Sequence, residues 1–392
     1  MLQKFRHHNY TEFVFGKGAE DSVGEDIRRL GGQRVLIVYG QGGHIRKSGL
    51  LDKIRMSLRD QGLEVFELCG IQTNPRLSMV KRGIALCREE QIDFLLAIGG
   101  GSVIDTCKAI GVGFYYNGDV WDLVKMPEEI EKMLPIAVVL TYPAAGSESS
   151  TGAVITNDEI EPMVKASIGA PVTRPVIAFE NPELTYSLPP YLTACGVADM
   201  YVHILERYFS PVEIGCMDYI AEGMLRAVIA FGRKVVEDPL NYDDRAEIMW
   251  LGTIAHNNTV GLGRPQDWAT HSLGHEISAL YDTAHGATLT IVGPGWMKYV
   301  HTSCIYRFAR YAREVFGIDE ADDGKAALKG IEATKEFYHD LGLPVSFEEA
   351  GIAADQIDYM AQHAVILGGG SIGRFMQLNG EDAKKIYELC LR

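Results

Sequence analysis

The sequence lacks any hydrophobic run long enough to cross a membrane. Its longest apolar stretches, such as residues 94–98, have the length of a buried strand, whereas a membrane-spanning helix needs about 20 consecutive apolar residues. The N-terminal run Met-Leu-Gln-Lys-Phe-Arg-His-His contains no apolar core of the kind that marks a secretory signal. We therefore expect a cytoplasmic protein with no membrane partner.

Paired cysteines are also absent. The 7 cysteines are odd in number and scattered, and none are spaced as Cys-x-x-Cys. A disulfide framework or a cysteine-rich zinc site would need regular pairs. The pattern predicts free thiols in a reducing compartment.

Basic residues are in deficit. Lys and Arg number 37 against 52 Asp and Glu, which gives a net charge of -15 and a sequence pI of about 5.2. An acidic surface repels phosphate backbones, so we do not expect a nucleic acid partner. With 392 residues, 47% of them hydrophobic, the chain is long enough for a large core and for two domains.

Residues 1–188 are predicted to form an α/β domain, because short apolar runs alternate with amphipathic helical segments. The expected strands are residues 34–40, 63–69, 94–99, 136–141 and 175–179, and the expected helices are residues 50–61, 75–90 and 103–112. This alternation predicts a doubly wound, Rossmann-like parallel sheet with helices on both faces. Strand-like runs on either side of Asn157 and Asp158 predict a β-hairpin.

The pattern changes after Leu188. Val and Ile runs give way to helical periods rich in Ala, Met, Leu, Glu and Arg. The clearest of these are residues 194–208, 214–237, 245–258 and 327–341. The sequence therefore predicts a second, all-helical domain over residues 189–392.

A glycine-rich segment, Gly99-Gly100-Gly101-Ser102, follows an expected strand and opens an expected helix. Glycines let the backbone approach a phosphate closely, and the first amides of a helix point toward an anion. The segment predicts a cradle for a dinucleotide phosphate, with Asp105 nearby. The alternative is an ordinary glycine-rich turn in which Asp105 is only a charge in the first turns of the helix.

A second glycine loop follows the first expected strand. It contains Gly40, Gly42, Gly43 and His44, with Arg46 and Lys47 behind them. In doubly wound folds an acidic residue here often binds the adenosine 2′-hydroxyl, but this loop has none. Space and positive charge favour a 2′-phosphate, so we expect NADP(H) in preference to NAD(H). The alternative is that Arg46 and Lys47 only begin a solvated helix.

Side chains of the kind that bind metals recur in the second half. Asp199 and His203 are four residues apart, as are His271 and His275, so each pair lies on one face of a helix. His285 follows the second pair. One carboxylate with several imidazoles suits zinc, iron, cobalt or nickel. Spacing leaves open which histidines join Asp199, and a chance polar cluster is the alternative.

A zinc protease would carry the sequence His-Glu-x-x-His on such a helix. This chain reads His-Ser-Leu-Gly-His, without the internal glutamate. The protease interpretation is therefore disfavoured.

The motifs taken together resemble one family. They are Thr-Asn74-Pro, the run Gly-Gly-Gly-Ser-Val-Ile-Asp-Thr-Cys-Lys, the run Thr-Tyr-Pro-Ala-Ala-Gly-Ser-Glu from Thr141, the Asp199 helix and the segment from Gln266 to Gly286. In this order they resemble the iron-containing, or group III, alcohol dehydrogenases, and within them the butanol dehydrogenase and NADPH-dependent aldehyde reductase branch. The resemblance extends over essentially the whole chain.

The resemblance implies specific site residues. Asp199, His203, His271 and His285 would bind the metal, and His275 would serve as a proton relay near the nicotinamide. The implied cofactor contacts are Asn74, Gly100, Gly101, Ser102, Asp105, Thr141, Tyr142, Ser147 and Lys165. The family fold is a dinucleotide-binding α/β domain followed by an all-helical, dehydroquinate synthase-like metal-binding domain, and members of this branch form dimers.

The implied reaction is reversible hydride transfer between NADP(H) and small aldehydes or primary alcohols such as butanal and butanol, with Fe²⁺ or Zn²⁺ polarising the carbonyl. One departure from the branch is that its glycine loop carries a serine where this chain has His44. A glycerol or other polyol dehydrogenase that uses NAD is an alternative of the same fold. A metal- or nucleotide-binding protein without turnover is an alternative of another class.

Overall fold

The computed structural model describes residues 3–213, 215–366 and 368–392. The chain divides into two compact units. One comprises His8–Leu188, and the other comprises Pro189–Arg392 together with the N-terminal segment through His7. The backbone N–H of Gln3 donates to the carbonyl of Gly263 at 2.8 Å. The α/β unit thus begins at His8, whereas we had expected residues 1–188 to form the first domain.

The first unit is built on a 6-stranded parallel sheet with the strand order β1-β8-β5-β4-β2-β3. The strands are β1 (Glu12–Phe15), β2 (Arg34–Gly40), β3 (Glu64–Ile71), β4 (Phe94–Gly100), β5 (Ile136–Tyr142) and β8 (Ile177–Glu180). The central strands β2, β4 and β5 are buried along nearly their whole length. Strands covered by helices on both faces need continuous apolar runs, which explains the apolar sequences of β2, β4 and β5.

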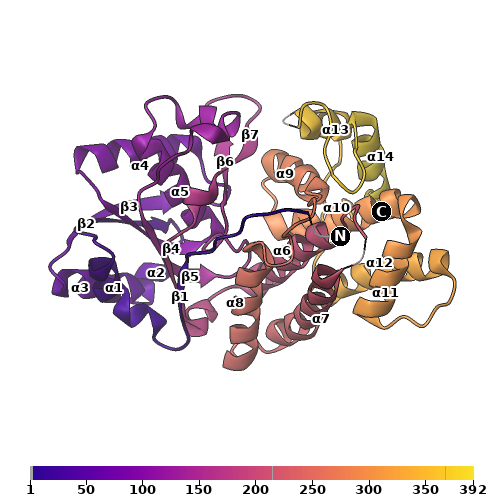
Figure 1. Cartoon of the computed structure of the whole chain (residues 1–392), viewed down its shortest axis with the longest axis horizontal. Helices are drawn as coiled ribbons and strands as arrows, with labels where there is room; N and C mark the ends of the chain where they lie inside the picture. The colour runs from indigo at the N-terminus through magenta and orange to yellow at the C-terminus, as the bar shows by residue number, and fades with distance from the viewer. Residues whose placement is uncertain (1–2, 214, 367) are drawn as a thin grey trace. The chain divides into compact units, whose positions relative to one another are not determined.

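Helices cover both faces of this sheet. They are α1 (Val23–Arg29), α2 (His44–Lys47), α3 (Leu50–Asp60), α4 (Leu77–Glu89) and α5 (Gly101–Tyr115). Ile27 of α1 and Ile54 of α3 join the core cluster that contains Ile37 of β2. Figure 1 shows α1 and α3 on one side of the sheet and α4 and α5 on the other.

The strand order reverses between β2 and β4. The chain runs from β2 outward to β3, then returns past β2 to β4 and continues to β5. In open α/β sheets, ligands bind outside the carboxyl ends of the strands at such a reversal. Strand β2 ends at Gly40 and strand β4 ends at Gly100, so both predicted glycine loops lie at the carboxyl edge of the sheet.

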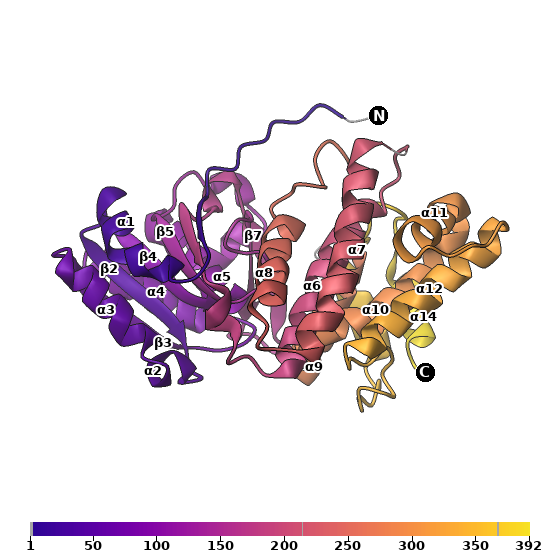
Figure 2. The ribbon, with the colours of Figure 1, turned by 90° about the horizontal axis from the view of Figure 1, so that it is seen from below.

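The second unit is helical. Its helices are α6 (Pro190–Tyr208), α7 (Cys216–Glu237), α8 (Tyr242–His256), α9 (Ala269–Tyr281), α10 (His285–Val300), α11 (Ile305–Phe316), α12 (Asp323–Asp340), α13 (Ile357–Ile366) and α14 (Gly380–Leu389). Helix α6 contacts α7, α8, α9 and α10, and Figure 2 shows α6 and α7 side by side. Every residue of α6 from Thr193 to Tyr208 is buried. Charged side chains on this helix therefore need partners inside the unit.

The predicted fold class, a Rossmann-like parallel sheet with an all-helical second part, is confirmed. The expected hairpin is formed by β6 (Gly152–Asn157) and β7 (Val164–Gly169). The helix expected over residues 214–237 corresponds to α7, and residue 214 lies outside the described residues. None of the helices in the described part of the chain combines the length and the apolar character needed to cross a bilayer.

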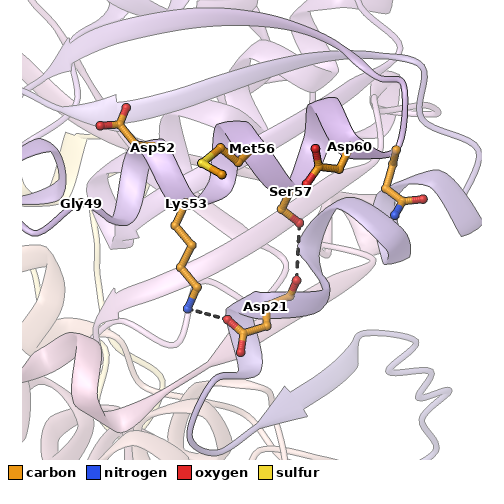
Figure 3. A pocket seen from close by; sticks show the side chains of 8 residues that line it. Asp21, Gly49, Asp52, Lys53, Met56, Ser57 and Asp60 are labelled. Atoms are coloured by element: carbon orange, nitrogen blue, oxygen red, sulfur yellow. Dashed lines mark hydrogen bonds and ion pairs between the residues drawn. The ribbon is translucent and has the colours of Figure 1, made fainter.

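A surface hollow of about 590 Å³ lies beside α3 (Figure 3). The ammonium group of Lys53 pairs with the carboxylate of Asp21, and the hydroxyl of Ser57 donates to the backbone carbonyl of Asp21. Asp52 and Asp60 also line the hollow, and no predicted site residue does. Its excess of carboxylates disfavours a phosphate-bearing ligand.

Candidate metal and nucleotide sites

The predicted metal ligands lie together within the helical unit. Asp199 and His203 are one turn apart on α6, and Asp199 Oδ1 lies 3.5 Å from His203 Nε2. The same oxygen lies 3.5 Å from Nε2 of His271 on α9 and 3.8 Å from Nε2 of His285. One ligand atom each from Asp199, His271 and His285 all lie within 4.8 Å of one another, and His203 is outside this group although it contacts Asp199. Asp199 is thus the common neighbour of the three imidazoles.

His285 is brought to α6 by a close helix approach. It is the first residue of α10, and Gly286 follows it. A Cβ atom at Gly286 would lie 2.1 Å from the carbonyl oxygen of Cys195, one turn before Asp199 on α6. Only glycine fits at this contact, which explains the His-Gly pair in the sequence.

The cluster has the properties of a cation site. In the described part of the chain, the buried atoms Asp199 Oδ1 and His271 Nε2 have no hydrogen-bond partner. Ligand atoms that surround zinc tetrahedrally with bonds of about 2.1 Å are about 3.4 Å apart. The observed separations of 3.5 to 3.8 Å match that spacing, and a carboxylate with neutral imidazoles is a suitable donor set. These residues therefore fit a divalent transition metal.

Electrostatics shifts the pKa values of the two buried imidazoles in opposite directions. Burial, with help from the neighbouring His256 and His271, holds the pKa of His203 well below its usual value, so this ring is neutral and able to bind a metal at pH 7. Burial also acts to lower the pKa of His271, but the carboxylates of Glu206 and Asp199 outweigh it and raise the pKa to about 9. A cation placed beside Asp199 would compete with that proton.

Glu206 is a component that the sequence analysis did not assign. It lies on α6, one turn after His203, and is 1% exposed. Its Oε2 pairs with Nδ1 of His271, and its Oε1 accepts the backbone N–H of His271 at 3.0 Å. The sequence spacing could have indicated Glu206, because a residue three positions after His203 lies on the same helix face as His203.

His203 is enclosed by further aromatic and charged groups. Its ring centroid lies 4.0 Å from that of His256 and 4.7 Å from that of His271. Arg207 donates to the carbonyl of His203 at 2.7 Å, lies within 3.2 Å of His256 Nδ1 and packs over Trp268. These contacts restrict the rotation of the His203 ring.

His275 lies on α9 beside the cluster rather than within it. Its ring centroid is 5.3 Å from that of His285 and 6.2 Å from that of His271. Like His203, it is outside the group of ligand atoms that lie within 4.8 Å of one another in the described part of the chain. Unlike His203, it is only partly buried. Its position fits a group that exchanges protons near the metal site.

The nucleotide candidates lie in the α/β unit, at the edge where β4 and β5 end. A Cβ atom at Gly100 would lie 2.8 Å from Cβ of Tyr142, and one at Gly101 would lie 2.9 Å from Cβ of Ala145. These glycines thus allow the loop after β5 to lie against the N-terminus of α5. Ser102 is in the first turn of this 15-residue helix, whose free amides favour an anion.

Asp105 is engaged inside this loop structure. Its carboxylate accepts the hydroxyl of Ser147 at 2.6 Å and the backbone N–H of Val154 at 2.8 Å. Lys108, one turn further along α5 and fully buried, donates to the carbonyls of Ser150 and Gly152. Asp105 and Lys108 therefore hold the loop that carries Ser147, and both oxygens of Asp105 are used within the protein.

Asn74 and Lys165 come together from distant parts of the chain. Lys165 on β7 donates to the side-chain oxygen of Asn74 at 2.9 Å. Asn74 has a φ of 56°, in the left-handed region. Backbone pairing between Arg76 and Thr156 fixes the hairpin beside the segment after β3. The bond from Lys165 to Asn74 therefore joins the hairpin to the carboxyl edge of the sheet.

The loop after β2 ends in a short helix. Gly43 has a φ of 68°, and His44 begins α2. Partial burial lowers the pKa of His44, so its ring is neutral near pH 7. Arg46 is exposed but donates to the phenol oxygen of Tyr39 at 2.6 Å. The cationic character of the loop thus rests on Arg46 and Lys47 rather than on His44.

Comparisons with known proteins cover the whole molecule. Residues 11–182 match the family model for iron-containing alcohol dehydrogenases, and residues 193–391 match the model for the C-terminal part of that family. The chain is 42% identical over 381 residues to NADH-dependent butanol dehydrogenase A of Clostridium acetobutylicum, covering 96% of this chain and 97% of the relative. It is 37% identical to the NADPH-dependent aldehyde reductase YqhD of Escherichia coli, covering 99% of both.

A solved structure is similarly close. The crystal structure of NADH-dependent butanol dehydrogenase A from Thermotoga maritima superposes with a TM-score of 0.96 at 38% sequence identity. The match covers 100% of this chain and 99% of that protein.

Proposed function

Because the chain belongs to the iron-containing alcohol dehydrogenase family, we propose that it catalyses metal-dependent, reversible hydride transfer between a nicotinamide dinucleotide and small aldehydes or primary alcohols. Butanal and butanol are the substrates we propose to test first, because a relative of this length is named for butanol. The observation that carries the proposal is the cluster of three imidazoles around the buried Asp199 oxygen.

We propose that Asp199, His203, His271 and His285 bind one divalent ion, Fe²⁺ or Zn²⁺. Such an ion, when bound, acts as a Lewis acid toward a carbonyl oxygen, and the reduced nicotinamide is the hydride donor. The role of the chain is to hold the ligands rigidly, which burial of α6 and enclosure of His203 support. Rigid ligands keep the reacting groups aligned and lower the entropy cost of reaction.

We assign the proton transfer to His275. Reduction of an aldehyde leaves an alkoxide that needs a proton, and imidazole exchanges protons near neutral pH. His275 is partly exposed and lies beside His285, so it can exchange with solvent.

We propose that the dinucleotide binds at the carboxyl edge of the sheet, where the strand order reverses. The proposed contacts are Gly40, Gly42, Gly43, His44, Asn74, Gly100, Gly101, Ser102, Thr141, Tyr142, Ser147 and Lys165. For Asp105 we propose support of Ser147 in place of direct contact, because its oxygens are already used. NADP(H) is the proposed preference, since the loop after β2 has no carboxylate and carries the exposed Arg46 and Lys47.

Two further properties follow as proposals. A homodimer is proposed on family resemblance. A reducing, cytoplasmic location is proposed because Cys69, Cys87, Cys107, Cys195, Cys216, Cys304 and Cys390 are all free thiols.

The test is oxidation of NADPH and of NADH with butanal, using chelated enzyme re-supplied with Fe²⁺ or Zn²⁺. We expect turnover only after a metal is added, and a higher kcat/KM with NADPH. A higher kcat/KM with NADH would reject the cofactor preference and leave the reaction standing. If neither cofactor is oxidised, the reductase proposal fails, and glycerol with NAD tests the polyol alternative.

A further inference from the structure

Glu206 directs both of its carboxylate oxygens to a single residue. Oε2 pairs with the ring nitrogen Nδ1 of His271, and Oε1 accepts the backbone N–H of the same residue. The carboxylate is almost completely buried. It comes from α6, whereas His271 lies on α9. Because both oxygens of this buried carboxylate bind one histidine, they restrict both the backbone position and the ring orientation of His271.

The ring contact determines which nitrogen of His271 carries hydrogen. An ionised carboxylate only accepts hydrogen bonds, so Nδ1 must be the donor. The lone pair of a neutral ring is then left on Nε2. This is the atom that lies 3.5 Å from Asp199 Oδ1 and has no hydrogen-bond partner in the described part of the chain. Glu206 thus leaves the metal-binding nitrogen free on the side that faces Asp199.

The backbone contact places His271 along the helix. Trp268 precedes α9 in a left-handed conformation with φ 65°, and its side chain does not cap the helix. The first backbone N–H groups of α9 donate instead to two carboxylates. The N–H of Ala269 donates to Asp267 at 3.0 Å, and the N–H of His271 donates to Glu206. Negative charge at a helix N-terminus is favourable. Glu206 therefore fixes both the position of the His271 backbone and the orientation of its ring.

We propose that Glu206 is the positioning residue of the metal centre, holding His271 in the tautomer and orientation that present Nε2 to the ion. This inference rests on the proposed metal-dependent function. Partners that donate to or accept from metal-bound histidines in this way change metal affinity by about 10- to 100-fold when they are removed.

If Glu206 had a purely structural role, its removal would not change metal binding. The chain provides a matched comparison, because Glu276 on α9 pairs with His363 Nδ1 at 2.7 Å and is also buried. His363 is not one of the proposed ligands. Loss of the Glu276 pair would affect packing alone, whereas loss of the Glu206 pair affects a ligand as well.

The experiment compares Glu206→Gln, Glu206→Asp and Glu276→Gln with the wild-type protein. Zn²⁺ affinity is measured by competition with a chelator, and the visible absorption spectrum of the Co²⁺-loaded protein reports ligand geometry. We expect Glu206→Gln to weaken Zn²⁺ binding about 10- to 100-fold and to alter the Co²⁺ spectrum. Glu206→Asp keeps the charge and should recover part of the affinity, and Glu276→Gln should leave both readouts unchanged.

Wild-type affinity and spectrum in both Glu206 variants would overturn the positioning role. Should Glu206→Gln fail to fold, ¹⁵N NMR of histidine-labelled, Zn²⁺-loaded wild-type protein replaces it. We expect hydrogen on Nδ1 of His271, and hydrogen on Nε2 would reject the proposal. Two controls separate the two ideas. A wild-type protein that binds no Zn²⁺ would refute the metal-dependent function itself, whereas unchanged Zn²⁺ affinity in His271→Ala would remove His271 as a ligand and overturn the positioning role alone.

Discussion

At the scale of single residues, Asp199 is the centre of the proposed metal-ligand cluster. Its Oδ1 is the atom shared by His203, His271 and His285. Asp199→Asn keeps the shape of the side chain but removes its charge and replaces one oxygen with an amide that cannot bind a cation. We expect metal affinity to fall by more than about 100-fold, the upper end of the effect of losing an outer partner. Metal analysis of the purified variant by mass spectrometry measures this.

The control for this variant is nucleotide binding. The proposed dinucleotide contacts all lie in the α/β unit, whereas Asp199 lies in the helical unit. NADPH titration, followed by fluorescence, should give the same Kd in Asp199→Asn and in the wild type. Full metal occupancy in the variant would show that Asp199 is not a ligand.

We expect His275 to be needed for catalysis but not for metal binding. Because His275 is not one of the proposed ligands and its ring lies beside those of His271 and His285, His275→Ala should retain the metal. Loss of a positioned acid–base group slows catalysis by about 100- to 10,000-fold, so we expect kcat to fall within that range. Steady-state kinetics and metal content are measured on the same preparation. A variant with wild-type kcat would exclude the relay, and one without metal would make His275 a ligand.

Contacts within one helix of the site could be predicted from the sequence, whereas contacts between helices could not. The four-residue spacing of Asp199 and His203 predicts one shared face, and their 3.5 Å contact agrees with it. The contact between Glu206 and His271 joins residues 65 positions apart. No local spacing predicts such a pair, because it depends on how α6 packs against α9.

At the scale of elements, the approach of α10 to α6 decides where His285 lies. A Cβ atom at Gly286 would clash with backbone atoms of Cys195, which no side-chain rotation can relieve. Gly286→Ala should therefore displace the start of α10, lower stability by about 1–3 kcal/mol as overpacking does and weaken metal binding. Chemical unfolding and metal affinity together measure this.

A glycine in open surroundings is the comparison for Gly286. Gly223 lies within α7, and a Cβ atom there would come no closer than 4.0 Å to another group outside the local helix backbone. Gly223→Ala should be neutral or stabilising by up to about 1 kcal/mol from helix propensity. If both variants behave alike, the close approach at Gly286 carries no cost.

The contact between α9 and α13 should make stability depend on pH. The hydrogen bond that His363 donates to the carboxylate of Glu276 raises the pKa of His363 above its usual value. A raised pKa in the folded state stabilises the protein fully below the usual histidine pKa of about 6.5, and this stabilisation disappears as the pH rises through the raised value. Since His363 is only partly buried, we expect a contribution of about 0.5–1 kcal/mol.

Replacing His363 tests this linkage. The unfolding free energy of the wild type and of His363→Gln is measured from pH 6 to pH 9. The difference between them should be largest at pH 6 and shrink as the pH increases. A difference that grows with pH would reject the assigned pair.

The elements that sequence reasoning recovered are those with strong patterns. Strands β2, β4 and β5 are continuous apolar runs, and the structure places them almost where the sequence predicts. Strand β1 was not predicted because it has 4 residues, of which the outer two are exposed and the inner two are half-buried. The start of α9 carries one local signal, Asp267, which accepts the N–H of Ala269, but the N–H of His271 is accepted by Glu206 from another helix.

At the scale of the whole molecule, alternation of strands and helices was enough to predict a parallel sheet beside a helical part. The reversal of strand order between β2 and β4 was not predictable in this way, since it depends on which strands pair in space. The glycine loops after β2 and β4 lie at one edge because these strands are parallel. At the reversal the connections that follow the two strands run in opposite directions, which is where open α/β sheets bind ligands.

At this scale, Zn²⁺ should stabilise the helical unit and NADPH should stabilise the α/β unit. The proposed metal ligands belong only to the helical unit, and the proposed nucleotide contacts belong only to the α/β unit. A ligand at 100 times its Kd stabilises the folded state by about 2.7 kcal/mol, which corresponds to an increase in Tm of about 5–10 °C for a unit of this size. Calorimetry should therefore show one increase with Zn²⁺ and another with NADPH. Asp199→Asn should lose the first and keep the second, even if both units melt together. An equal Zn²⁺-induced increase in that variant would place the stabilising metal at another site.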